Sequence, residues 1–235
     1  MKKHNKEFKI TFRDTDKEGN LKINALVDFM QDIAREHATI LGVNFEDVNS
    51  KYYWIILRTK INIIKTPKID ESIRIETYPS GIDKLFTVRE FNIYNKENEK
   101  LGDIKGYYLL MEYNKTFPVK IKGNPKFSIF NNIYEGEKVE KLILTNQESK
   151  KHITRRVFSS DIDVNGHMNN AHYIRWCLDM YNTDELYAKQ IKSVQIQYEK
   201  QVLENEEIDM NRYNNGYIIG KKGEETSFIA KVEFY

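Results

Sequence analysis

The chain has 235 residues, enough for one large domain or two small ones. A hydrophobic share of 40% and a charged share of 31% are typical of a soluble globular protein. The formal net charge of +2 gives the whole molecule no strong attraction for nucleic acid, and the longest apolar run, residues 52–57, is far too short to span a bilayer. We therefore expect neither a nucleic-acid partner nor a membrane partner.

The same composition argues about compartment and cofactors. Cys177 is the single cysteine, so no internal disulfide can form and a reducing compartment is expected. The basic N-terminal residues lead into no apolar segment of the kind found in signal peptides, which predicts a cytoplasmic protein. No His, Cys and carboxylate residues have metal-ligand spacing, and no Gly-rich phosphate loop is present, so no metal or other cofactor is expected.

The first half of the chain predicts one helix followed by several strands. A short strand over residues 8–12 leads into a polar turn over residues 13–20. Apolar residues at helical spacing, among them Leu26, Met30 and Ile33, predict a helix over residues 23–42, with Gly42 as its C-terminal stop. Alternating apolar residues then predict strands, with a hairpin loop over residues 95–100 before the last of them. These strands are expected over residues 55–63, 72–78, 85–94 and 104–113, the last of them central because it is apolar on both faces.

The second half repeats this order after a segment with a weak pattern. Pro118, Pro125 and a charged run through Glu140 predict a connecting segment with little regular structure. A polar turn and a helix are then expected over residues 161–180, followed by strands over residues 192–198, 208–212, 216–220 and 227–235. We therefore predict a first domain over residues 1–130, a linker over residues 131–150 and a second domain over residues 151–235.

An internal repeat relates the two halves. Three residues of the first polar turn recur in the second at a constant shift of 147 positions (161 minus 14). The matched pairs are Asp14 with Asp161, Asp16 with Asp163, and Gly19 with Gly166. Glu18 and Asn20 of the first turn are replaced by Asn165 and His167 in the second. Two copies of one helix and an antiparallel sheet are the simplest account, and only the second copy carries an Asp/Asn/His set.

The second turn carries the residues best suited to chemistry. Asp163, Asn165 and His167 lie at alternate positions just before a helix, whose first N–H groups could polarise a carbonyl. Asp163 would act as base or nucleophile, Asn165 would orient water or substrate, and His167 would move a proton, because histidine titrates near neutral pH. These groups predict hydrolysis of an ester or thioester. A purely structural capping role for the same turn stays open.

Three other residues invite a functional interpretation and are better explained otherwise. Cys177 lies on the apolar face of the second helix, which favours a packed core thiol over a nucleophile. His37 lies on the apolar face of the first helix and is expected to be a hydrogen-bonded core residue. His172, early in the second helix, is expected to be a surface or capping residue.

Residues 161–170, with Tyr173, Ile174 and Trp176, resemble the signature of acyl-acyl-carrier-protein thioesterases, the plant and bacterial enzymes that end fatty-acid synthesis. Further similar motifs lie in the first half, at residues 31–34, 36–38, 78–81 and 89–91. The resemblance covers nearly the whole chain. Because no transit-like segment precedes Phe8, the bacterial type is expected.

The resemblance implies an α+β fold, a tandem hot-dog in which each half wraps an antiparallel sheet around one long helix. It implies hydrolysis of a fatty acyl thioester on acyl carrier protein (ACP), with release of free fatty acid. Asp163, Asn165 and His167 match the catalytic residues of the family. The first half would then hold a degenerate site and the acyl pocket.

This chain departs from the family at two positions. Gln201 and Val202 stand where the family has a Glu and, in plants, a neighbouring Cys, so a cysteine nucleophile is not expected. Asp163 becomes the first candidate for the general base and Glu199 the second, with Gln201 as a possible additional site residue.

Three alternatives stay open. The same chemistry could act on acyl-CoA, and a non-catalytic protein that binds acyl thioesters is favoured by Gln201. Dehydration of hydroxyacyl chains occurs on the same fold but fits the Asp/Asn/His turn less well. The expected partner is ACP bearing a fatty acyl chain. The chain is expected to be a monomer in which the two halves form a pseudo-dimer, or a homodimer.

Overall fold

A computed structural model of the chain describes residues 3–44, 51–130, 132–143 and 148–235. The chain divides into two compact units, the first formed by Met1–Lys22 and Asp28–Val139, the second by Ile23–Val27 and Glu140–Tyr235. The boundary after Val139 falls inside the segment 131–150 that the sequence predicts to be a linker. Residues 131 and 144–147 of that segment lie outside the described residues.

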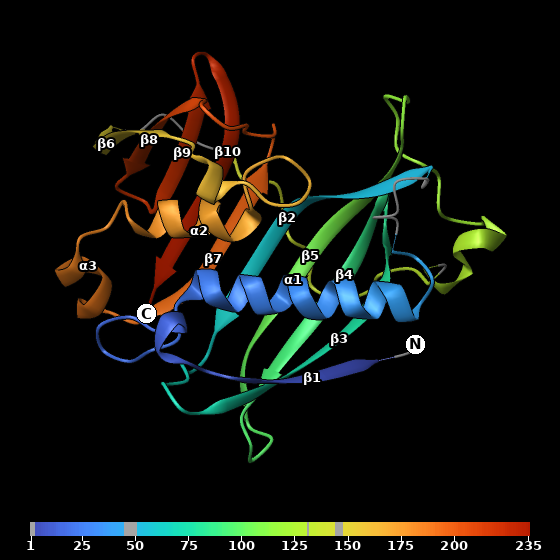
Figure 1. The fold of residues 1–235 in the computed structure, drawn as a ribbon, viewed down its shortest axis with the longest axis horizontal. Helices are drawn as coiled ribbons and strands as arrows, with labels where there is room; N and C mark the ends of the chain where they lie inside the picture. Colours follow the sequence, from blue (N-terminus) through green and yellow to red (C-terminus); the bar gives the residue numbers. More distant parts are fainter. Residues whose placement is uncertain (1–2, 45–50, 131, 144–147) are drawn as a thin grey trace. The chain divides into compact units, whose positions relative to one another are not determined.

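The first unit is an antiparallel sheet with the larger part of the long helix α1 (Ile23–Ile40), from Asp28 onward, against one of its faces (Figure 1). The strands follow each other in the order β1-β3-β4-β5-β2, and every neighbouring pair is antiparallel. They are β1 (His4–Lys9), β2 (Tyr52–Ile63), β3 (Ser72–Asp83), β4 (Phe86–Tyr94) and β5 (Lys100–Glu112). The predicted interior place of the fourth strand is confirmed, since β5 pairs with both β4 and β2.

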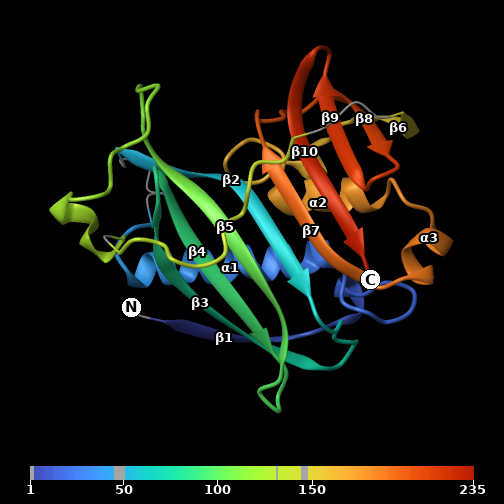
Figure 2. The ribbon, with the colours of Figure 1, turned by 180° about the vertical axis from the view of Figure 1, so that it is seen from behind.

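The second unit repeats this arrangement with its own helix. Read from its β6 edge, its strands follow the order β6-β8-β9-β10-β7, which matches β1-β3-β4-β5-β2 of the first sheet position by position. They are β6 (Ser149–Arg156), β7 (Ile191–Tyr198), β8 (Glu207–Tyr213), β9 (Tyr217–Lys222) and β10 (Glu225–Phe234). Helix α2 (Asn170–Leu178) lies against one face of this sheet, and the short helix α3 (Thr183–Ala188) follows it (Figures 1 and 2). The internal repeat read from the sequence is therefore a repeat of topology.

Helix α1 forms where its apolar periodicity predicts it. Leu26, Met30 and Ile33 are buried on one face of the helix, as the spacing requires. The helix ends at Ile40, and Gly42 adopts the left-handed conformation, φ +68°, that commonly closes a helix. The apolar spacing thus sets the buried face of this helix, and Gly42 marks its end.

Three elements differ from the sequence prediction. The first strand ends at Lys9, and Phe12 belongs to the short 3-10 helix Phe12–Asp14 instead. Strand β6 was not predicted because its residues are mostly charged or polar and it lies at the edge of its sheet, where charged side chains are common. Helix α3 was missed because its six residues carry no apolar stripe; its start is set by a capping box of Asn182 and Glu185.

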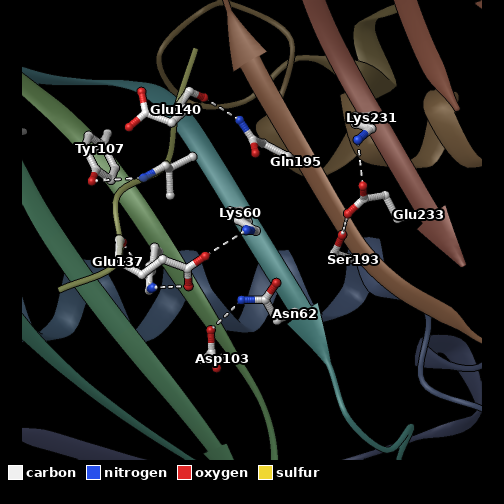
Figure 3. Close-up of polar contacts among 12 residues, drawn as sticks. Lys60, Asn62, Asp103, Tyr107, Glu137, Glu140, Ser193, Gln195, Lys231 and Glu233 are labelled. Atoms are coloured by element: carbon white, nitrogen blue, oxygen red, sulfur yellow. Dashed lines mark hydrogen bonds and ion pairs between the residues drawn. The ribbon is translucent and has the colours of Figure 1, made fainter. Parts of the chain in front are cut away.

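The segment with a weak pattern is held by the sheets rather than by secondary structure of its own. In the first unit, Glu137 forms ion pairs with Lys60 (3.3 Å) and Lys105 (3.1 Å) of β2 and β5. In the second unit, the Gln195 side chain of β7 donates to the Glu140 carbonyl at 2.7 Å. Figure 3 shows Glu137 of the segment facing Lys60, and Gln195 facing Glu140 of the segment. Side chains of the strands therefore order a segment that lacks periodicity.

Buried residues of α1 should dominate the stability of this arrangement. Ile33→Ala is expected to lower the free energy of unfolding by about 3 kcal/mol, because Ile33 is fully buried and its removal leaves a cavity. The same substitution at Ile40, which is 55% exposed at the end of the same helix, should change it by less than about 0.5 kcal/mol. Urea unfolding of both variants checks this; equal losses would contradict the assigned core.

Candidate functional site

The second polar turn is a tight backbone loop. Asp163 N donates to His167 O at 3.0 Å, and Gly166 N donates to Asp163 O at 3.0 Å. Ile162 and Met168 form an antiparallel bridge at the base of the loop. Gly166 adopts φ +81°, in the left-handed region that favours glycine, which lets the chain reverse within these few residues.

This loop brings the three predicted catalytic side chains together. Asn165 N donates to Asp163 Oδ1 at 2.8 Å, and Asn165 Nδ2 donates to Asp163 Oδ2 at 3.3 Å. His167 Nδ1 lies 3.9 Å from Asp163 Oδ1. The Asp163 and His167 side chains remain 18% and 27% exposed, so a bound substrate can reach both. The three side chains lie together in a tight loop rather than along an extended segment, and the catalytic role of each stays a prediction.

The first turn shows what the same loop looks like without the histidine. There Asp16 N donates to Asn20 O at 2.9 Å, as in the second copy, but Asp16 Oδ1 accepts two backbone bonds, from Glu18 N and Asn20 N, both at 2.9 Å. Within the described residues, His167 N makes no such bond to Asp163. The second carboxylate therefore has one backbone donor fewer and keeps more capacity to accept a proton.

The start of α2 is already capped by the chain. Asn169 Oδ1 accepts from Ala171 N at 3.0 Å, and Asn169 O accepts from His172 N at 2.9 Å. Asn169 is thus the N-cap of α2. The expectation that free N–H groups at this helix start polarise a carbonyl is wrong for Ala171 and His172, because both groups are bonded within the protein.

The two additional candidates lie apart from this grouping. Met168 N donates to Val202 O at 2.9 Å, which ties the loop that carries Gln201 to the turn. Gln201 itself is exposed. Glu199 accepts from Gln197 Nε2 and lies 3.9 Å from Lys141 Nζ, at the edge of a depression of about 400 Å³. Among the described residues, neither Gln201 nor Glu199 hydrogen-bonds to the three residues of the turn.

Tyr173 is a residue of the site that the sequence reasoning missed. Its ring is buried and makes edge contacts with Tyr198 and Phe228, with ring centroids 5.3 Å apart in each pair. Burial is the main cause that raises the pKa of its hydroxyl; a backbone hydrogen bond with Val202 opposes the rise, and the charge of Asp163 adds to it. The hydroxyl therefore meets the backbone of Val202, whose carbonyl accepts from Met168 N at the base of the turn. Helical spacing identifies the ring as core but does not show which group its hydroxyl meets.

The other singled-out residues are structural. Cys177 is buried and unpaired by any disulfide, and burial raises the pKa of its thiol, which confirms a packed core thiol. His37 is buried, with Nδ1 3.0 Å from Arg89 Nη1 and its ring stacked on His4, which confirms a hydrogen-bonded core histidine. His172 Nδ1 lies 3.0 Å from Asp161 Oδ1, so it is a partner of a buried carboxylate and not merely a surface residue.

None of the helices in the described residues is both long and apolar enough to cross a membrane. No group of three or more His, Cys, Asp or Glu side chains in the described part of the chain is placed to hold a metal ion.

Family models cover most of the chain. The model of the acyl-ACP thioesterase N-terminal domain matches residues 1–124, and that of the acyl-ACP thioesterase C-terminal domain matches residues 143–233. The chain belongs to the acyl-ACP thioesterase family. The resemblance read from the turn and helix motifs is confirmed, and the two matches fall on the two halves of the internal repeat.

Curated relatives come from plants. A chloroplastic palmitoyl-acyl carrier protein thioesterase of Gossypium hirsutum is 23% identical over 196 residues, which cover 76% of this chain and 47% of that protein. A chloroplastic oleoyl-acyl carrier protein thioesterase of Coriandrum sativum is 20% identical over 208 residues, covering 80% and 56%. The chain thus spans about half the length of the curated relatives it matches.

Solved structures match along nearly the whole chain. An acyl-ACP thioesterase of Bacteroides thetaiotaomicron has a TM-score of 0.87 at 23% identity and covers 99% of this chain and 98% of its own. The 12:0-ACP thioesterase of Umbellularia californica has a TM-score of 0.84 at 17% identity, with coverage of 99% and 97%. These similarities confirm the predicted tandem hot-dog fold of this family member.

The left-handed glycine of the turn can be tested with a matched control. Gly166→Ala should lower the free energy of unfolding by about 1 kcal/mol, because alanine is strained at φ +81° although its Cβ would meet open space. Gly223→Ala, at φ +56° and equally open, should cost a similar amount.

Only Gly166→Ala should impair acyl-thioester turnover, because only Gly166 sets the spacing of Asp163 and His167. Thermal unfolding and a thiol-release assay of both variants check this. Equal turnover in the two variants would show that the turn geometry does not matter for the chemistry.

Proposed function

We propose that the chain hydrolyses fatty acyl thioesters carried on ACP, releasing free fatty acid and holo-ACP. The observation that carries this proposal is the convergence of Asn165 and His167 on the carboxylate of Asp163 in the second turn. Family membership supports the substrate class. In this proposal the second unit holds the reacting groups and the first unit contributes the acyl pocket.

Asp163 acts as the general base on water. Its Oδ1 is fixed by Asn165 N and faces His167 Nδ1, so the carboxylate is oriented and retains lone pairs for a proton. Water attacks the thioester carbonyl carbon while its proton passes to Asp163. Asn165 holds Asp163 Oδ2 through its amide, and its side-chain carbonyl is available to position the attacking water.

His167 completes the proton balance. When the carbon–sulfur bond breaks, protonated His167 donates to the departing thiolate, which leaves as the free thiol of the carrier. The proton held by Asp163 then returns to His167, 3.9 Å away, through a small side-chain movement or one water. One water is consumed, and one acid and one thiol are formed.

A cysteine nucleophile has no place in this scheme. Cys177 is buried, and burial raises the pKa of its thiol, which keeps it in the unreactive protonated form. Val202 occupies the position where plant members of the family have a cysteine. Gln201, a neutral amide, cannot act as a base, which leaves Asp163 as the base of the proposal.

The proposal predicts unequal losses at equivalent positions of the two copies. Asp163→Asn and His167→Ala should each reduce kcat by at least about 100-fold, the usual contribution of a positioned acid or base. Asp16→Asn, the matching change in the first turn, should leave kcat within about threefold of the native value, because Asp16 binds only its own loop.

The assay is release of free thiol from a panel of acyl-ACP and acyl-CoA thioesters of different chain lengths. Folding of each variant is checked by circular dichroism. Full activity of Asp163→Asn would refute the assigned roles. Faster turnover of acyl-CoA than of acyl-ACP would identify acyl-CoA as the preferred substrate. Tight acyl binding without turnover would favour the non-catalytic alternative that Gln201 suggests.

Gln201 provides a separate prediction. Because no described contact joins Gln201 to Asp163 or His167, Gln201→Ala should lower kcat by less than about tenfold, well below the loss for an acid or base. The same thiol-release assay decides it. A loss as large as that of Asp163→Asn would make Gln201 part of the reacting group.

The proposal also includes a cellular location and an oligomeric state. We place the enzyme in the cytoplasm, where its one cysteine stays reduced. We take the two fused units as a pseudo-dimer that acts as a monomer or a homodimer.

A further inference from the structure

A buried carboxylate next to the turn, that of Asp161, accepts hydrogen bonds from two side chains of α2 as well as from the backbone. Asp161 ends the 3-10 helix Ser159–Asp161, and its side chain is only 6% exposed. Its Oδ1 accepts from His172 Nδ1 at 3.0 Å and from Arg175 Nη2 at 2.7 Å. Its Oδ2 accepts from Phe158 N at 3.1 Å. Two side chains of α2 are thus fixed to one carboxylate.

Asp161 is also close in sequence to the proposed catalytic residues. One residue, Ile162, separates Asp161 from Asp163. Asp161 O also accepts from Asn169 N, the N-cap of α2, at 2.9 Å. The backbone of Asp161 and its carboxylate therefore hold both the entry and the exit of the loop against the first two turns of α2.

The first copy of the repeat shows that the loop closes without these side chains. Asp14, the counterpart of Asp161, also accepts from a backbone N–H, that of Thr11, at 2.9 Å, and its carbonyl accepts from Lys22 N at 2.9 Å. At the shift of 147, however, the counterparts of His172 and Arg175 are Ala25 and Asp28. Neither can donate a side-chain hydrogen bond to a carboxylate.

We propose that Asp161, His172 and Arg175 form a positioning network that holds the turn carrying Asp163, Asn165 and His167 in its reactive geometry. Among the described residues, contacts from helix side chains to this carboxylate occur only in the copy with the Asp/Asn/His set. In the other copy the Asp14 carboxylate accepts from Thr11 Oγ1 at 2.5 Å and lies 3.6 Å from Arg13 Nε, both from residues before the loop and not from the helix. The extra contacts therefore serve the chemistry rather than the fold. This inference rests on the proposed function for its kinetic consequence, but not for its structural one.

Charge adds a second effect to the geometric one. Asp161 and Asp163 are two carboxylates separated by one residue in the sequence, and the Arg175 cation offsets the charge of the first. The titratable group beside Asp163 itself is His167, whose Nδ1 lies 3.9 Å from Asp163 Oδ1. Loss of the Arg175 cation leaves an uncompensated negative charge beside these groups, which favours their protonated forms. The pH dependence of turnover should then move to higher pH.

The test compares two arginines that pair with carboxylates around the same helix. Arg175→Met removes the bond to Asp161, while Arg155→Met removes the 2.8 Å ion pair with Asp179 at the other end of α2. Arg175→Met should lower kcat by about tenfold, because a small misplacement of reacting groups is costly. It should leave KM for acyl-ACP within about twofold and shift the pH–rate profile upward. Arg155→Met should do none of these, and Arg175→Lys should recover part of the loss.

Amide hydrogen exchange followed by NMR tests the network without any substrate. In Arg175→Met, the amides of Asp163 and Gly166, which close the loop, should exchange at least about tenfold faster, while amides of β7 and β10 stay unchanged. Unchanged loop exchange in Arg175→Met would overturn the network, whatever the kinetics. If the native protein shows no turnover and loop exchange is still faster in Arg175→Met, the network is supported and only the proposed function is overturned.

Discussion

The site depends on a backbone constraint, the closure of a loop by the bond from Asp163 N to His167 O. Closure is possible because Gly166 adopts a left-handed conformation that other residues take at a cost. Closure brings Asn165 and His167 next to the carboxylate of Asp163. Everything else in the site, from the cap at Asn169 to the bonds of Asp161, holds this loop against α2.

Duplication separates what the fold needs from what the chemistry needs. Both copies share the strand order, the loop-closing bond and the carboxylate that binds the backbone before the loop. They differ where side chains meet that loop. Asn20 gives way to His167, and Ala25 gives way to His172. The first copy thus acts as an internal reference in which the same backbone carries no acid–base pair.

Much of this could be predicted from the sequence because it is periodic or repeated. The apolar spacing of Leu26, Met30 and Ile33 defines α1, and the constant shift between the halves identifies the second turn as the altered copy. Elements without periodicity were missed, such as the charged edge strand β6 and the short helix α3. Contacts between residues distant in sequence were missed too. Nothing in spacing shows that the Tyr173 hydroxyl meets the Val202 backbone, or that Arg175 reaches Asp161.

Gln201 bears on how the chemistry is distributed. Its loop is tied to the turn through Met168 N and Val202 O, so this position stays near the site whatever residue occupies it. A neutral amide there can donate and accept hydrogen bonds but cannot take a proton at neutral pH. Glu199 accepts from Gln197 and lies 3.9 Å from Lys141 Nζ, with no hydrogen bond to the turn among the described residues. With Asp163 as the proposed base, the precision of its loop becomes the main requirement of the proposed reaction. A network that fixes Asp161 to two side chains of α2 meets this requirement.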